Sequence, residues 1–393
     1  MIALLALPLT VAGFAVLAIV IFFMIEVLAS GSYQQPLSPP RTPRGRIAVI
    51  IPAHNEAAGV AATIASAKSG LRQGDQVLVV ADNCTDATAD AARAAGAEVI
   101  ERFDAGHRGK GYALQFGVDH LRADPPETVV FLDADCTPVA DAIDRIARLA
   151  SLHDRPVQAL YLAHAAAEAG PASAVSAFAW LLMNRVRMEG LQALGGFSRI
   201  TGSGAAFPWK LISTRVLATG EIVEDLALTV SLVEVGAAPM LDTGAVVETT
   251  LASSASGAAT QRARWELGSL RLALRKSGGL MASAVMGKPR NMLMALDLLV
   301  PPLTVLAAVI VCGVVASLPL AIAGRGEAFG LFMMAGLFFA AAVSDAWHFD
   351  GRKVLPPAAL AGLWPYFLSK LRVYGGEGRK SARDWTRTDR GKD

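Results

Sequence analysis

The chain has 393 residues, of which 53% are hydrophobic and 18% are charged, and its formal net charge is +2. This composition is too apolar for an ordinary soluble domain and too polar for a transporter with many spans. The small net charge excludes a global basic surface of the kind that binds nucleic acid, so we expect no nucleic-acid partner. Cys84, Cys136 and Cys312 have the spacing of neither a disulfide framework nor a zinc site. We therefore expect a soluble domain attached to a few membrane segments.

The chain begins with an apolar run. Residues 1–30 are interrupted by Glu26 only near the end, and they exceed the roughly 20 residues that cross a bilayer. A cleaved signal peptide is the alternative, but the run is long for one and has neither a basic start nor a good cleavage site. Residues 31–46 form a proline-rich linker that ends in positive charge. Positive charge beside a span favours the cytoplasm, so we expect the following domain there.

Short apolar runs alternate with helical patterns from residue 47 onward. The runs IAVIIPA, QVLVVAD, AEVIERF and VVFLDAD are separated by alanine-rich stretches of helical length. This alternation is typical of βαβ units and a parallel sheet. Glycine-punctuated sequence, including GSGAAFPW and AVVETT, then indicates a more mixed second half. We predict one α/β domain over residues 47–260.

Two segments are amphipathic. Residues 177–194 carry charges among large apolar side chains, and residues 261–283 begin with leucines and arginines on different faces of a helix. Basic charge beside an apolar stripe suits the membrane interface. Surface helices that pack on the protein core are the alternative. We expect an amphipathic interface helix over 261–283.

The last third of the chain contains further apolar sequence. Residues 294–347 are long enough for a transmembrane hairpin around the short turn GRGE. Residues 354–374 contain three prolines, and residues 375–393 form a basic tail that should stay in the cytoplasm. With one span before the domain and two after it, a further crossing would place this tail outside. We therefore expect 354–374 to be re-entrant or interfacial.

Two carboxylates, Asp133 and Asp135, directly follow the apolar run VVFL. They should lie at the carboxyl end of a parallel strand, where open α/β sheets bind ligands. Two acidic groups there can hold Mg²⁺ or Mn²⁺, hard ions that take oxygen ligands and bridge to a diphosphate. A solvated loop is the alternative for so short a motif.

Polar residues also follow the first two predicted strands. Asp82 ends QVLVVAD, where an acidic group can contact a ribose or a base, while Asp86 is a candidate helix cap. The segment from Pro52 to Glu56 follows the first strand, so its amides and the Glu56 carboxylate can meet a nucleotide. Capping by Asn55 is the alternative there.

An acidic pair, Glu224 and Asp225, opens an apolar helical pattern in GEIVEDLAL. In an inverting sugar transfer, one carboxylate removes the proton of the acceptor hydroxyl while a metal stabilises the departing diphosphate. We predict Asp225 for this role, with a favourable contact to the helix dipole as the alternative. Further along, QRARW at residues 261–265 combines arginines that can bind a diphosphate with a tryptophan that can stack on a sugar, or it anchors the membrane surface.

The ordered set IIPAHNE, VVADNCTD, RGKGYAL, FLDAD, GSGAAF, VEDLAL and QRARW resembles the family 2 glycosyltransferases of GT-A fold, especially membrane-associated members related to polysaccharide synthases. The resemblance covers residues 47–275. It implies a Rossmann-like GT-A domain with a mixed central sheet, on the cytoplasmic face of a bacterial-type inner membrane. It also implies inverting transfer of a hexosyl or N-acetylhexosaminyl group from a nucleotide-diphospho-sugar, which we expect to be a UDP-sugar.

The resemblance implies roles for individual residues. The donor is expected to lie against Pro52, Ala53, Glu56, Asp82, Lys110, Asp133 and Ala134. Asp133 and Asp135 are expected to hold the metal, and Asp225 matches the catalytic base. The acceptor and the diphosphate are expected near Gly202, Ser203, Gly204, Glu224, Gln261, Arg262, Arg264 and Trp265. The chain departs from commoner members in Asn83, where a second aspartate is frequent, and in the GSG motif, where a cysteine-containing motif is often found.

The expected acceptor is a polysaccharide or a lipid-linked glycan, with membrane lipids and polysaccharide-export proteins as further partners. A processive synthase similar to chitin or hyaluronan synthases is an alternative, because QRARW resembles their hallmark. About three spans argue against a self-contained secretion pore, and the length of the products separates these two functions. A non-catalytic membrane scaffold is a more remote alternative.

Overall fold

The computed structural model describes residues 2–36, 38–39, 44–165, 170–251 and 255–363. The chain divides into two compact units. The sheet unit contains residues 34–169 and 196–268, and the helical unit contains residues 1–33, 170–195 and 269–375. Residues 170–195 thus interrupt the continuous domain that the sequence predicts over 47–260.

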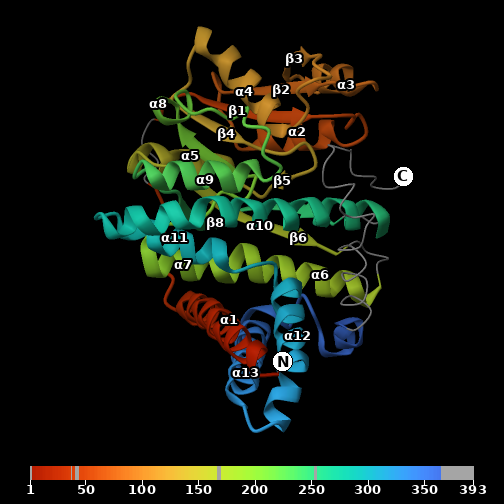
Figure 1. The fold of residues 1–393 in the computed structure, drawn as a ribbon. Coiled ribbons are helices and arrows are strands. Elements are labelled where there is room, and N and C mark those ends of the chain that lie inside the picture. The colour runs from red at the N-terminus through yellow and green to blue at the C-terminus, as the bar shows by residue number, and fades with distance from the viewer. Residues whose placement is uncertain (1, 37, 40–43, 166–169, 252–254, 364–393) are drawn as a thin grey trace. The chain divides into compact units, whose positions relative to one another are not determined.

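One eight-stranded sheet, with the order β3-β2-β1-β4-β7-β6-β8-β5, forms the centre of the sheet unit (Figure 1). The strands are β1 (Ile47–Ala53), β2 (Gln76–Asp82), β3 (Glu98–Arg102), β4 (Thr128–Phe131), β5 (Thr137–Pro138), β6 (Val157–His164), β7 (Ala205–Pro208) and β8 (Met240–Thr250). Strands β3, β2, β1 and β4 run parallel, whereas β7 is antiparallel to both of its neighbours. The predicted Rossmann-like sheet with a mixed second half is therefore confirmed.

Helices cover this sheet and bury its apolar strands. They are α2 (Val60–Ser69), α3 (Thr88–Ala94), α4 (Lys110–His120), α5 (Ala142–His153), α8 (Trp209–Ile212) and α9 (Glu224–Glu234). Leu114 of α4 and Leu232 of α9 share one core cluster with Ile50 and Phe131 from the strands. Continuous burial along β1 and β2 explains why these strands are uniformly apolar instead of alternating.

The parallel strands determine where polar loops meet. Because β2, β1 and β4 are neighbours and run in one direction, their carboxyl ends lie at the same edge of the sheet. Asp82 ends β2, Ala53 ends β1 and Asp133 follows β4. Ligands of open α/β sheets bind at such an edge.

Among its described residues, the helical unit contains three helices that are long and apolar enough to cross a membrane. They are α1 (Ile2–Ser30), α12 (Leu303–Ile322) and α13 (Glu327–Ala346), with α13 continued by a π-helical turn, Trp347–Gly351. Helix α1 packs against both α12 and α13 (Figure 1). The same unit includes α6 (Pro171–Leu181) and α7 (Arg187–Gly195), which are joined by the π-helical segment Leu182–Val186. The long helix α10 (Ala255–Val285) contributes to both units.

The second span begins later than the sequence predicts. Residues near Met294 belong to a separate helix, α11 (Pro289–Leu299), and not to the transmembrane hairpin predicted over 294–347. Pro301 and Pro302 explain the break, because proline cannot donate a backbone hydrogen bond and pushes the residue before it into an extended conformation. Val300 is indeed extended, with φ −73° and ψ 103°.

The predicted segment 354–374 is described only in its first part. There, Pro357–Gly362 forms a short 3₁₀ helix. The remainder of this segment and the basic tail 375–393 lie outside the described residues, so their membrane placement stays a prediction.

A buried arginine joins three helices of the helical unit. Arg187 of α7 donates from Nε to Glu26 of α1 at 2.6 Å and from Nη2 to Asp297 of α11 at 2.8 Å. The exposed fractions of the three side chains are 0%, 0% and 1%. The sequence assigns the charges of 177–194 to a membrane interface, but Arg187 is enclosed instead, because two carboxylates compensate its charge.

We expect Arg187→Ala to lower the thermal unfolding midpoint of the detergent-solubilised protein strongly. Removing the cation leaves two carboxylates buried together, which costs about 3–5 kcal/mol. Arg185→Ala is the control, because Arg185 also pairs with two carboxylates, Glu189 at 3.2 Å and Asp350 at 3.4 Å, but its side chain is 37% exposed. Equal shifts in the two variants would contradict a structural role for the buried group.

Candidate active site

Two loops meet beyond the end of β4. The Asp133 amide donates to Ser203 Oγ at 3.0 Å, and the Gly204 amide donates to the Phe131 carbonyl at 2.9 Å. Gly202 and Gly204 have φ values of +91° and +71°, which disfavour other residues. The two glycines therefore allow the GSG loop to turn tightly against the carboxylate loop.

Lys110 connects the same loops from a third element. It is the first residue of α4, and its ammonium group forms an ion pair with Asp133. The same ammonium group donates to the Gly202 carbonyl at 2.7 Å. Lys110 thus fixes the position of the Asp133 carboxylate relative to the GSG loop.

Gly202 lies at the point where three charged side chains converge. A Cβ atom placed on Gly202 would lie 3.3 Å from Lys110 Nζ, 3.5 Å from Asp225 Oδ2 and 3.9 Å from Asp133 Oδ2. These side chains come from α4, α9 and the loop after β4. The absence of a side chain at Gly202 therefore leaves space that all three groups border.

Local hydrogen bonds hold Asp225 in place at the start of α9. Its Oδ1 accepts a hydrogen bond from the Leu226 amide at 2.8 Å. Its backbone carbonyl accepts one from Thr229 Oγ1 at 2.9 Å, and that hydroxyl accepts one from the Ile200 amide, also at 2.9 Å. The first turn of α9 is thereby attached to the strand-edge loops.

A pocket that is open to solvent adjoins these groups, and its volume with the open solvent at its mouth is about 510 Å³. Lys110, Gly202 and both acidic residues of α9, Glu224 and Asp225, line one side of it. Apolar side chains line the remainder, among them Leu114 of α4 and Leu228 of α9. Polar and apolar groups therefore border the same open pocket.

The acidic groups of the site resist ionisation. Burial and the neighbouring Asp225 raise the pKa of Glu224 to about 7. Burial also raises the pKa of Asp225 and of Asp133, although the cation of Lys110 opposes both increases. Burial alone would lower the pKa of Lys110, but Asp133 and the acidic pair of α9 raise it. A cation added beside these carboxylates would favour their ionised forms.

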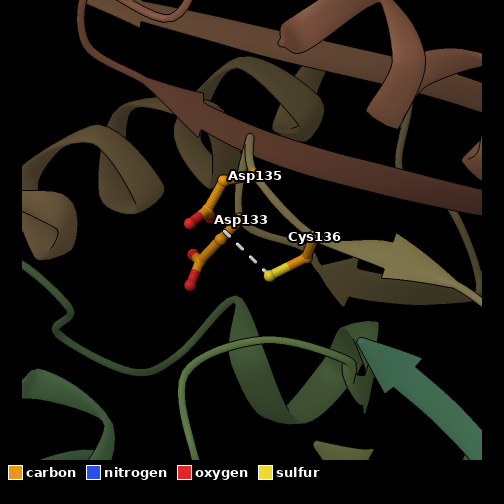
Figure 2. A group of neighbouring side chains, drawn as sticks. All are labelled: Asp133, Asp135 and Cys136. Atoms are coloured by element: carbon orange, nitrogen blue, oxygen red, sulfur yellow. Dashed lines mark hydrogen bonds between the residues drawn. The ribbon is translucent and has the colours of Figure 1, made fainter. Parts of the chain in front are cut away.

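A divalent cation fits the donor set after β4. Ligand atoms of Asp133, Asp135 and Cys136 lie within 4.8 Å of one another. Figure 2 shows their side chains directed to the same side of the loop. Carboxylate oxygens are the donors that Mg²⁺ and Mn²⁺ prefer, so the residues present suit such an ion.

Asp82 lies at the expected strand edge, but another side chain engages it. Its Oδ1 accepts hydrogen bonds from Arg102 Nη1 at 2.7 Å and from Asn83 Nδ2 at 2.9 Å. Burial raises the pKa of Asp82, although Arg102 opposes this effect. Arg102 is the last residue of β3, and the sequence-based prediction did not include it. The sequence offers only one indication of its role, namely a basic residue at the end of a predicted strand.

The remaining predicted donor residues lie around the end of β1. Pro52 and Ala53 are its last two residues, and Ala134 is buried between the two aspartates. The Glu56 amide donates to Thr88 Oγ1 at 2.7 Å, which ties this loop to the start of α3. Asp86 accepts a hydrogen bond from the Thr88 amide at 3.0 Å, but the N-cap residue of α3 is Ala87, so the predicted cap at Asp86 is wrong.

The QRARW segment lies on α10. Gln261, Arg262 and Arg264 are helical, but their side chains lie outside the described part of the structure. Trp265 is 38% exposed. One turn further on, a Cβ atom on Gly268 would lie 3.1 Å from Val223, the residue before Glu224. This turn of α10 therefore passes beside the acidic start of α9.

Two more residues escaped the sequence-based prediction. The positive charge of Arg199 lowers the pKa of Asp225, against the larger effect of burial. Cys136 Sγ lies 3.7 Å from Asp135 Oδ1 and 3.3 Å from the Tyr161 hydroxyl. Both residues lie close to predicted motifs: Arg199 is three residues before Gly202, and Cys136 directly follows DAD.

Comparisons with known proteins match this architecture. Residues 48–166 match the family model described as glycosyl transferase family 2. A search of curated proteins gives no match. Mannosyltransferase PcManGT from Pyrobaculum calidifontis, solved in complex with GDP-Man and Mn²⁺, is 18% identical, with 89% of this chain and 100% of that chain covered and a TM-score of 0.54.

Glucosyl-3-phosphoglycerate synthase from Mycobacterium tuberculosis, solved with Mn²⁺, UDP and glucosyl-3-phosphoglycerate, is 20% identical. That comparison covers 56% of this chain and 78% of the other, with a TM-score of 0.36. The likeness to the mannosyltransferase concerns the fold, and the family model covers the strands that carry Asp82 and Asp133. Residues 48–166 therefore match the family 2 glycosyltransferase model, and the fold of the chain is similar to that of a glycosyltransferase.

Proposed function

We propose that this protein transfers a sugar, with inversion, from a nucleotide-diphospho-sugar to a hydroxyl group of a polysaccharide or lipid-linked glycan at a membrane. The observation that carries the proposal is the convergence of Lys110, Asp133 and Asp225 around Gly202. Sugar transfer requires charge compensation for a departing diphosphate and a base beside the acceptor, and this arrangement provides groups for both roles.

The donor lies at the carboxyl edge of the parallel strands in this proposal. Asp82 and the loop after β1 border the nucleoside, and Lys110 lies beside the diphosphate. Asp133 and Asp135 hold Mg²⁺ or Mn²⁺, which supplies electrostatic stabilisation for the leaving diphosphate. The ion pair between Lys110 and Asp133 supports this placement, because a cation already compensates the carboxylate there.

Asp225 is the proposed general base. Its Oδ2 faces Gly202, and the pocket beside it offers space for an acceptor. A hydroxyl in this space can transfer its proton to Asp225 as oxygen attacks the sugar carbon and the bond to the diphosphate breaks. Burial favours the reaction because a carboxylate with a raised pKa is a stronger base than one in water.

The membrane context follows from α1, α12 and α13, which are apolar enough to span a bilayer. We infer that they attach the catalytic domain to the cytoplasmic face of a membrane, since positive charge follows α1 at Arg44 and Arg46. An acceptor that remains at the membrane suits this arrangement.

Asp225→Asn should lower the turnover number at least about 100-fold, because the amide cannot accept the proton of the acceptor hydroxyl. The measurement is release of nucleoside diphosphate by detergent-purified protein with Mn²⁺ and membrane lipid extract. The donors are UDP-sugars, which the sequence resemblance favours, and GDP-mannose, which the similar mannosyltransferase binds.

Glu234→Gln, at the other end of α9, is the control and should retain activity. Donor binding should persist in Asp225→Asn. Near-normal turnover in Asp225→Asn would show that another group is the base. Silence of the unchanged protein with every donor would contradict the proposed activity.

Turnover should rise with pH through the titration of the Glu224–Asp225 pair, near the pKa of about 7 at Glu224. Below that range the buried pair retains a proton, and the fraction of protein with an ionised base falls. Glu224→Gln removes a neighbouring negative charge, so the midpoint should move to lower pH. A pH profile of turnover at saturating donor measures this shift. An unchanged midpoint would show that the charge of Glu224 does not affect ionisation of the base.

Gly202→Ala should lower turnover about tenfold or more, because its methyl group would crowd the Lys110 ammonium group at 3.3 Å and would fill the space that Asp225 borders at 3.5 Å. Gly236→Ala is a matched control: Gly236 also has a positive φ, of +82°, but an added Cβ would meet no atom within 4 Å. Both variants incur similar backbone strain, so turnover per folded molecule isolates the effect at the site. Equal activities would contradict the convergence at Gly202.

A further inference from the structure

We propose that Cys136 is a third protein ligand of the metal held by Asp133 and Asp135, and that its sulfur makes the site prefer thiophilic ions such as Cd²⁺ and Co²⁺ over Mg²⁺. This inference rests on the proposed function in one respect: both place the metal site in the loop after β4. It specifies which ions that site selects.

The separation between donor atoms supports a shared ion. Cys136 Sγ lies 3.7 Å from Asp135 Oδ1, and ligand atoms of all three residues lie within 4.8 Å of one another (Figure 2). Metal bonds of about 2.3 Å to sulfur and about 2.1 Å to oxygen place two ligands about 3.6 Å apart at a tetrahedral angle. At this distance the Cys136 thiol donates a hydrogen bond to Asp135 Oδ1, and the same separation suits two ligands of one ion once the thiol proton has left.

The loop backbone holds these side chains together. The Cys136 amide donates to the Asp133 carbonyl at 3.1 Å, which closes a tight turn over the DADC sequence. Thr249 of β8 donates to the Asp135 backbone carbonyl at 3.2 Å. The ligand residues are thus fixed before any ion binds, which lowers the entropic cost of assembling the site.

Cys136 also has an outer partner. Its side chain is 0% exposed, and its sulfur lies 3.3 Å from the buried hydroxyl of Tyr161 on β6. When a metal replaces the thiol proton, that proton leaves to solvent and the Tyr161 hydroxyl can donate to the sulfur. Hydrogen bonds of this kind orient metal ligands and tune their affinity.

Sulfur changes the selectivity expected from two carboxylates. Oxygen ligands alone suit Mg²⁺ and Mn²⁺, whereas a thiolate favours softer ions. The spacing of Cys136 from other cysteines gave no indication of a metal site, because its companion ligands are the adjacent aspartates and not further cysteines. The chain contains three cysteines, and Cys84 and Cys312 serve as internal controls.

The test is titration of the full-length, detergent-purified protein with Cd²⁺ alone, followed by ultraviolet sulfur-to-metal charge-transfer absorption. Cys84→Ala/Cys312→Ala, which retains Cys136 as its one thiol, should show the band at undiminished amplitude. Adding Cys136→Ser should abolish the band and weaken Cd²⁺ binding at least about tenfold, by analogy with the loss of even an outer-shell partner. Competition with Mg²⁺ should show that Cys136→Ser changes the affinity for Mg²⁺ little.

Adding Asp133→Asn and Asp135→Asn to the single-thiol protein should also weaken the band at limiting Cd²⁺. No band in the single-thiol protein, or an unchanged titration without the two carboxylates, would overturn the proposal. Thermal unfolding verifies that each variant is folded. Because the titration contains neither donor nor acceptor, it is independent of sugar transfer: transfer without a band rejects this inference alone, and a band without transfer rejects the proposed function alone.

Discussion

The compensation of carboxylate charge by Lys110 is the interaction on which the proposed active site depends. Asp133 and Asp225 come from opposite halves of the sheet unit, and burial disfavours the ionised form of each. Lys110 forms an ion pair with Asp133, donates to the Gly202 carbonyl and also opposes the pKa increase at Asp225. One cation at the start of α4 thus lies beside the acidic groups from the β4 loop and from α9 where both border Gly202.

The two units contain charged clusters that differ in their exposure to solvent. Arg187, Glu26 and Asp297 are enclosed in the helical unit, so their mutual contacts serve the packing of helices. Lys110 and Asp133, in contrast, keep 21% and 25% of their side chains exposed beside a pocket. The enclosed Arg187 cluster stabilises one packing of the helices. At the partly exposed pair, a metal ion can replace part of the charge compensation that Lys110 gives to Asp133.

Local patterns made much of the sheet unit predictable. The runs IAVIIPA and QVLVVAD coincide with β1 and β2, and the strand before Asp133 placed both carboxylates at the correct sheet edge. Contacts between elements that are distant in the sequence could not be predicted, because they depend on tertiary packing. The burial of Arg187 depends on carboxylates from two distant helices, and the contact between Arg102 and Asp82 depends on strand order. The late start of α12 was readable from Pro301 and Pro302, but the apolar composition of 294–324 masked that signal.

The central claim is that the loop after β4 holds a metal-bound diphosphate between Lys110 and the acidic start of α9. Anomalous X-ray scattering at the manganese edge, from crystals grown with Mn²⁺ and the nucleoside diphosphate, tests it most directly. We expect one strong peak within coordination distance of Asp133 or Asp135, with the diphosphate beside Lys110. A peak elsewhere, or a diphosphate bound away from this edge of the sheet, would contradict it.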